Sequence, residues 1–139
     1  MIRLGRTIPA LPVVEIQEAV SFYRDRLGFI AVHAEDGFAI VRRDAAEIHL
    51  WMASDSRWQS ELDKDRPIRS GAESFLAGTA SCRIEVEGVD ALYDEYRAND
   101  VVYSPETVVE DTSWGTREFP ALDLHRNLLT FFESTGETE

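Results

Sequence analysis

Glu47, His49 and Trp51 are the residues of this sequence whose types and spacing most readily support chemistry. They alternate along Glu47–Met52, a stretch that reads as a strand, so their side chains would share one face. An imidazole beside a carboxylate can bind a metal or move a proton, and an indole offers a flat apolar surface to a ligand. Phe38, which opens a predicted strand, and Trp114, in a predicted loop, are further aromatic side chains.

Each of these residues also has a purely structural interpretation. His49 could be a buried histidine with satisfied hydrogen bonds, and Trp51 could close the sheet. Phe38 is equally consistent with a core and with a groove. Trp114 lies among polar residues beside Gly115, which favours a position in an exposed groove.

Other catalytic patterns find little support. The sequence has no glycine-rich loop after a strand and no Gly-x-Ser-x-Gly motif, and no spacing supports a catalytic triad. Cys82 is the only cysteine, which excludes an internal disulfide and a multi-cysteine metal site. We expect it to be a small buried residue, because the cation that could activate it, Arg83, would point to the opposite face.

The elements that must position these residues occur twice. Ile16, Ala19, Val20 and Tyr23 follow the spacing of an amphipathic helix, with Gly28 as a helix-ending residue. The same pattern recurs 73 residues later, at Val89, Leu92, Tyr93 and Tyr96. Any two amphipathic helices share this spacing, so the repeat depends on the strands around them.

A strand-like stretch precedes each helix and three follow it. The turn signals Asp36-Gly37 and Arg43-Asp44 separate those of the first half. The strands expected in the first half are Thr7–Val14, Phe29–Ala34, Phe38–Arg43 and Glu47–Met52, and those in the second are Ser81–Val86, Val101–Tyr103, Thr116–Leu122 and Leu128–Glu133.

The pattern predicts an α+β fold of two βαβββ modules, whose curved mixed sheets surround a concave cleft. We expect a single domain over residues 1–139. Its parts would be a first module at about 7–52, a joint at 53–78, a second module at about 79–133 and a polar tail at 134–139.

Composition narrows the possible partners. The chain is 44% apolar and has a net charge of −12, with the acidic excess almost entirely in its second half. This charge argues against nucleic-acid binding and favours a cationic ligand, although solubility alone also explains acidity. No stretch is a secretory signal or is long enough to span a membrane, so we expect a cytoplasmic protein.

Two stretches near the C-terminus resemble the signature of the bleomycin resistance proteins, a branch of the glyoxalase and extradiol dioxygenase (vicinal oxygen chelate) superfamily. They are Ser113–Phe119 (SWGTREF) and Asn127–Glu133 (NLLTFFE). Similar motifs of the superfamily occur at Ile8–Val13, Ala19–Tyr23, Asp25–Phe29 and Val86–Tyr93. One departure is the turn at Asp123–Asn127 (DLHRN), which lacks the family's proline and glycine.

The resemblance also supplies a test for catalysis. Enzymes of the superfamily hold one divalent metal, and their ligand positions fall here on Ile8, His49, Ser81 and Thr130. Isoleucine cannot bind a metal and neutral hydroxyls are poor ligands, so one imidazole remains. We therefore expect no metal and no cofactor, and a protein that is not an enzyme.

The resemblance implies that ligand binding involves His33, Phe38, His49, Trp51, Trp114, Gly115 and Arg117. It also implies a homodimer that exchanges its N-terminal arm at Pro9, with clefts at the subunit boundary. Our hypothesis is sequestration of a bulky, aromatic, cationic antibiotic such as a bleomycin-type glycopeptide. The alternatives are a metal-dependent glyoxalase, dioxygenase or thiol transferase, and a structural dimer with an unused cleft.

Overall fold

The computed structural model describes residues 1–53 and 76–136. The first module consists of β1 (Ala10–Val13), α1 (Ile16–Asp25), β2 (Ile30–Glu35), β3 (Phe38–Arg43) and β4 (Ala46–Met52). Its strands form a sheet in the order β1-β4-β3-β2, in which β1 runs parallel to β4 and the other neighbours are antiparallel.

The second module repeats this arrangement with β5 (Ser81–Glu85), α3 (Val89–Ala98), β6 (Glu110–Asp111), β7 (Thr116–Leu122) and β8 (Leu128–Ser134). The sheet order is β5-β8-β7-β6, again with one parallel pair, β5 and β8. The predicted α+β fold of two βαβββ modules is therefore confirmed. Most of the predicted joint, and the last three residues of the predicted tail, lie outside the described residues.

Two predicted strands were wrong in extent or position. The first strand begins at Ala10 instead of Thr7: the Pro9 carbonyl still accepts the His49 N–H of β4 at 3.0 Å, but the residues before Pro9 are exposed and outside the sheet. In place of the strand at Val101–Tyr103, only Val102 forms a bridge, to Ala121. A turn closed by the Thr107 N–H and the Ser104 carbonyl redirects the chain, and the edge strand forms later as β6.

Local signals account for the bounds of α1. The Glu15 side chain accepts a hydrogen bond from the Glu18 N–H at 2.7 Å and caps the N-terminus. The chain leaves the helix through Gly28, which has a φ of +82° and would bring any Cβ within 2.6 Å of the Arg43 guanidinium. The predicted role of Gly28 as a helix-ending residue is confirmed.

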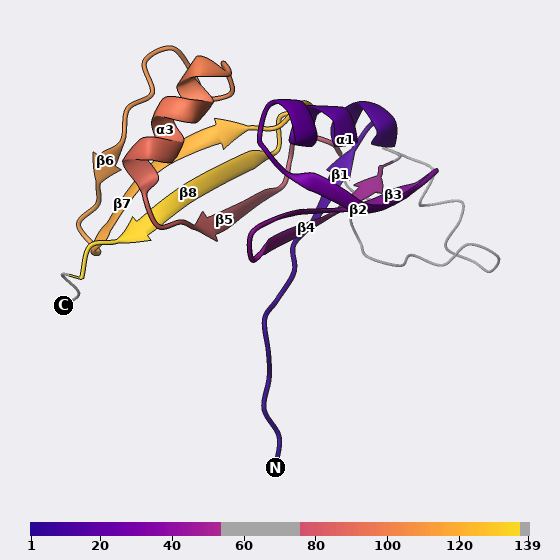
Figure 1. The fold of residues 1–139 in the computed structure, drawn as a ribbon, viewed down its shortest axis with the longest axis horizontal. Helices are drawn as coiled ribbons and strands as arrows, with labels where there is room; N and C mark the ends of the chain where they lie inside the picture. Colours follow the sequence, from indigo (N-terminus) through magenta and orange to yellow (C-terminus); the bar gives the residue numbers. More distant parts are fainter. Residues whose placement is uncertain (54–75, 137–139) are drawn as a thin grey trace.

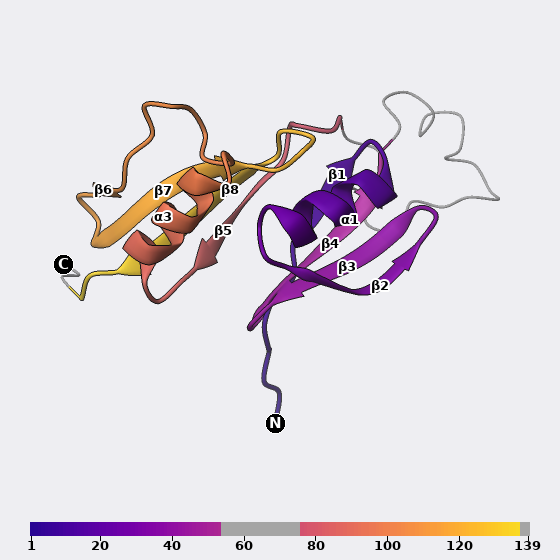
Figure 2. The ribbon, with the colours of Figure 1, turned by 45° about the horizontal axis from the view of Figure 1, so that its top comes forward.

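Each sheet has one covered face and one open face. α1 and α3 lie on the same side of the molecule, and the N-terminal segment extends away from it (Figures 1 and 2). The side chains between each helix and its sheet form the core. They include Tyr23, Leu50, Tyr96, Phe119 and Phe131, each at most 2% exposed. The opposite faces are open to solvent, and all six residues of β2 are exposed.

The modules pack against each other through buried polar groups. The Tyr23 hydroxyl in α1 donates to Asp123 Oδ2 at 2.9 Å, and Asn127 Nδ2 donates to the Pro12 carbonyl at 2.8 Å. In the opposite direction, the Tyr96 hydroxyl in α3 donates to the Leu27 carbonyl at 2.6 Å. The helix of each module is thus hydrogen-bonded to the other module.

No helix in the described parts of the chain meets the length and hydropathy required to cross a bilayer.

The unusual turn between β7 and β8 is stabilised by Asp123. Its Oδ1 accepts the N–H groups of His125 and Asn127, at 3.0 and 2.9 Å. Arg126 adopts the left-handed conformation, with a φ of +73°, that glycine would otherwise supply. A carboxylate and one strained residue thus replace the proline and glycine.

Candidate functional site

Four of the predicted site residues form an aromatic cluster on the open face of the first sheet. Register places Phe38 beside Trp51 and aligns His33, Ile40 and His49 across three strands. The Phe38 ring lies at the centre, with centroid distances of 4.4 Å to Trp51, 5.3 Å to His49 and 5.8 Å to His33. Ile48 and Leu50 are buried beneath the helix, as the alternation predicted.

A network of charged side chains adjoins this cluster on the same face of the sheet. Glu47 Oε2 lies 2.9 Å from His49 Nε2, and Glu47 Oε1 pairs with Arg42 at 2.9 Å and Arg6 at 3.2 Å. The Glu47 side chain is only 7% exposed. Hydrogen bonds from His49 and Arg42 hold the pKa of this carboxyl below its ordinary value. An ionised carboxylate can only accept hydrogen bonds, so Nε2 is the donor in the pair of His49 and Glu47.

The open face of the second sheet carries a different group of side chains. Phe132 on β8 lies beside Glu118 on β7 in the strand register. The Arg83 guanidinium, from β5, sits 4.7 Å from the Phe132 ring centroid and pairs with Glu118 at 2.7 Å. This pair lowers the pKa of Glu118 and raises that of Arg83. Ring, carboxylate and cation thus adjoin on one surface.

The three predicted site residues of the second module, Trp114, Gly115 and Arg117, do not lie together on one face. Trp114 precedes β7 and is 64% exposed, so it is not a core residue. Gly115 turns the chain with a φ of +93°, and its carbonyl accepts the Thr135 N–H at 2.9 Å. Arg117 lies on the helix side, paired with Asp90 at 2.9 Å and Asp111 at 3.1 Å. Glu118, its neighbour, takes the open face instead.

Cys82 lies on the helix side of β5, with Arg83 on the other side. Burial, followed by the charge of Asp123, raises the pKa of the thiol from its ordinary 9.0 to about 11. Such a thiol stays protonated at neutral pH and is a poor nucleophile. The predicted interpretation of Cys82 as an unreactive residue agrees with this environment.

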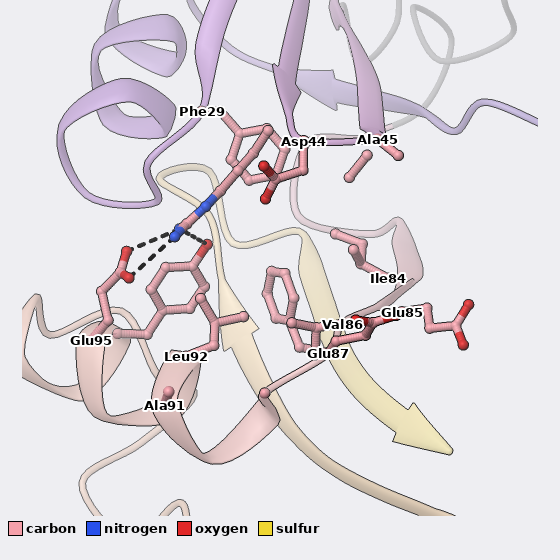
Figure 3. Close-up of a pocket in the computed structure, with 15 residues that line it drawn as sticks. Phe29, Asp44, Ala45, Ile84, Glu85, Val86, Glu87, Ala91, Leu92 and Glu95 are labelled. Atoms are coloured by element: carbon pink, nitrogen blue, oxygen red, sulfur yellow. Dashed lines mark hydrogen bonds and ion pairs between the residues drawn. The ribbon is translucent and has the colours of Figure 1, made fainter.

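A separate pocket of about 570 Å³ lies between the two modules (Figure 3). Phe29, Leu92 and Tyr96 form part of its apolar wall, and Arg43 crosses it to pair with Glu95 at 2.9 Å. Burial raises the pKa of Tyr96 to about 12. None of the predicted site residues lines this pocket, which depends on the packing of the modules and could not be read from either repeat alone.

Comparison with known proteins identifies the family. The sequence profile of the Glyoxalase/Bleomycin resistance protein/Dioxygenase superfamily matches residues 3–131. The bleomycin resistance protein of Geobacillus stearothermophilus is 48% identical over 128 residues, which cover 92% of this chain and 96% of that protein. The chain belongs to this superfamily.

Solved structures with this fold include both binding proteins and enzymes. A bleomycin-binding protein from bleomycin-producing Streptomyces verticillus, complexed with copper(II)-bleomycin, is 26% identical with a TM-score of 0.70, covering 99% of this chain and 100% of that one. A lactoylglutathione lyase from Agrobacterium tumefaciens has a TM-score of 0.71 at 17% identity, covering 94% of each chain. The fold alone therefore does not tell a binding protein from an enzyme. That distinction depends on the side chains at the site.

The four residues that the sequence resemblance assigned to metal positions lie in the N-terminal segment and on three strands. Ile8 lies in the N-terminal segment and His49 on β4, with its Nε2 bonded to Glu47. Ser81 and Thr130 belong to the second sheet and offer neutral hydroxyls. In the described parts of the chain, no three His, Cys, Asp or Glu side chains group to hold a metal.

Sequence reasoning missed Arg83 and Glu118 as a pair on the open face. The alternation along β5 correctly assigned Arg83 to the side opposite Cys82. Which residues would meet it depends on the order β5-β8-β7 and on the register between those strands. No local pattern contains that information.

Proposed function

We propose that this protein binds a bleomycin-type glycopeptide and sequesters it in the cytoplasm without transforming it. The observation that carries the proposal is the cluster of His33, Phe38, His49 and Trp51 on an open sheet face. Two findings support the choice of ligand. The curated relative at 48% identity is named a bleomycin resistance protein, and the structure at 26% identity contains copper(II)-bleomycin.

The chemistry of the cluster suits such a ligand. Planar heteroaromatic rings, such as a bithiazole, bind by stacking on flat side chains, and an attached cation gains from the same ring faces. The net charge of −12 attracts a cationic ligand at long range. Trp114, with its indole 64% exposed, offers a further ring from the second module.

Binding without catalysis follows from the available donors. A metal-dependent reaction would need several ligands, and Ile8, Ser81 and Thr130 supply neither imidazole nor carboxylate. We therefore favour the binding protein over the glyoxalase, dioxygenase or transferase alternative. Metal analysis of the purified protein tests this choice, and stoichiometric iron, manganese, nickel or zinc bound through His49 would overturn it.

The ligand site is complete, on this proposal, in a homodimer with exchanged N-terminal arms. Residues Met1–Thr7 are exposed, with Ile2 and Leu4 each 90% accessible. The N-terminal segment extends from the body ahead of β1 (Figure 1), and Pro9 directly precedes that strand. Apolar side chains on an extended segment are stabilised when a second copy covers them. The exchange would bring the open face of one copy's first sheet opposite the other copy's second sheet. Deletion of residues 1–8 should give a monomer in light scattering, and an unchanged dimer would contradict the exchange.

Calorimetric titration with bleomycin tests the function directly. We expect one ligand per chain and a rise in thermal midpoint. Trp114→Ala should weaken binding by about tenfold, because it removes one stacking surface. Tyr103→Ala is the matched control, since Tyr103 is also an exposed ring of the second module, at 55%. Absence of both heat and thermal shift in the wild-type protein would reject the proposal.

A further inference from the structure

The Arg83 side chain occupies a surface that has the chemistry of a cation-binding site. Its guanidinium lies 4.7 Å from the Phe132 ring centroid and donates to Glu118 Oε1 and Oε2, at 2.7 and 3.4 Å. A ring face combined with a carboxylate binds ammonium and guanidinium groups in general, whether they come from the protein or from a ligand. Here the cation comes from the protein itself.

The carboxylate is held in place independently of Arg83. The Thr116 hydroxyl donates to Glu118 Oε1 at 2.8 Å, and Thr112 Oγ1 lies 2.8 Å from Thr116 Oγ1. The Glu118 side chain is 17% exposed, whereas that of Arg83 is 46% exposed. Glu118 and Phe132 therefore form the fixed part of the arrangement, and the long Arg83 side chain forms the movable part.

Arg83 also comes from a strand that leaves it room to move. Among the described strands, β5 pairs only with β8, so it is an edge of its sheet. Arg117 on β7 provides the contrast, because Asp90 and Asp111 both pair with it and it lies against α3 on the covered side. Of these two arginines, Arg83 alone combines one carboxylate, one ring and an open face.

We propose that Glu118 and Phe132 form a subsite for the cationic end of the ligand, and that Arg83 fills this subsite until the ligand displaces it. The inference rests on the proposed function, since it places the positive end of the bound glycopeptide on the open face of the second sheet. Arg83 acts as an internal competitor. It lowers affinity for any cation and keeps the buried side of Glu118 paired when no ligand is present.

Two ligands that differ in charge test the subsite. Bleomycin and bleomycinic acid, which lacks the terminal amine, are titrated into the wild-type dimer and three variants. Arg83→Gln should tighten bleomycin by about fivefold, and Glu118→Gln should weaken it by about fivefold or more, the range of a cation over a ring with a carboxylate. Neither variant should change the affinity for bleomycinic acid in the same direction, because that molecule ends in a carboxylate, which Glu118 repels and Arg83 attracts. Arg117→Gln, the matched control, should alter neither ligand.

A second probe separates failure of the subsite from failure of the proposed function. Spermidine, a simple polyamine, is added while the side-chain Nε–H signals of arginine are followed by NMR. Displacement predicts a shift of the Arg83 signal that is lost in Glu118→Gln, with the Arg117 signal unmoved. A protein that shows this shift but binds no bleomycin would retain the subsite and lose the proposed function. Weaker bleomycin binding in Arg83→Gln, or an Arg83 signal insensitive to spermidine, would overturn the subsite.

Discussion

Arg26 and Asn99 occupy equivalent positions in the two modules and bind each other reciprocally. The Arg26 guanidinium donates to the Asn99 carbonyl through Nε and Nη2, at 2.9 and 2.6 Å, and Asn99 Nδ2 donates to the Arg26 carbonyl at 2.9 Å. Their separation of 73 residues equals the offset between the helices. Each residue ends one helix, so the exchange joins the C-terminal ends of α1 and α3.

Replacement of Asn99 tests how much this exchange stabilises the fold. Asn99→Ala removes the Nδ2 donor and leaves the Arg26 carbonyl without it, which should lower the free energy of unfolding by about 1–2 kcal/mol. Urea denaturation monitored by circular dichroism measures the change. Arg24→Ala is the control, because Arg24 pairs only with its exposed neighbour Asp25 among the described residues. An equal midpoint for both variants would show that the exchange has no stabilising role.

Two buried tyrosines, Tyr23 and Tyr96, and the partly buried Cys82 predict a loss of stability at alkaline pH. Burial raises the pKa of Cys82 from 9.0 to about 11 and that of Tyr96 from 10.0 to about 12, and it also raises that of Tyr23. The unfolded chain therefore releases these protons first as the pH rises, so these groups should leave the free energy of unfolding unchanged between about pH 7 and pH 9 and lower it from there to about pH 12.

Urea midpoints measured between pH 7 and pH 11.5 check this profile. Cys82→Ala should remove the fall between about pH 9 and 10 and make it shallower up to about pH 11, while the fall that the tyrosines cause from about pH 10 should remain. Stability that stays constant to pH 11 in the wild-type protein would contradict the burial of these groups.

The sequence predicted the modules well because their signals are local. The spacing of apolar residues predicted both helices. The alternation along Glu47–Met52 predicted that His49 and Leu50 lie on opposite faces of the sheet. It predicted less about contacts made across strands or between modules. The family resemblance placed Arg117 among the ligand-binding residues, and alternation along the strand allows only one of Arg117 and Glu118 on the open face. The choice depends on Asp90 in α3 and Asp111 in β6, which attract the guanidinium to the covered side.

Arg126 offers a simple way to stabilise the β7–β8 turn. Its φ of +73° is unfavourable for a residue with a Cβ, and glycine adopts it without strain. Arg126→Gly should raise the free energy of unfolding by about 0.5–1 kcal/mol, and Arg126→Ala, which retains the strain, should not. Thermal denaturation of the three proteins compares them. A glycine variant no more stable than the alanine variant would mean that the turn relaxes when the chain is free to do so.

Phe38 is the residue on which the aromatic cluster depends, since its ring contacts His33, His49 and Trp51. Phe38→Ala should raise the Kd for bleomycin by about 10- to 100-fold, because it removes one stacking surface and loosens the others. Phe38→Leu keeps apolar area without the ring and should fall between alanine and wild type. Calorimetry measures each affinity, and circular dichroism confirms that the variants fold.

The matched control is Phe22→Ala. Phe22 lies on α1, on the helix side, with the Arg26 guanidinium 5.3 Å from its ring centroid. Its loss should reduce stability and leave the Kd for bleomycin unchanged, because the ring is remote from the open face. Equal affinities for Phe38→Ala and wild type would remove the first sheet from the site. If Trp114→Ala still weakened binding, the ligand would then lie on the second module alone.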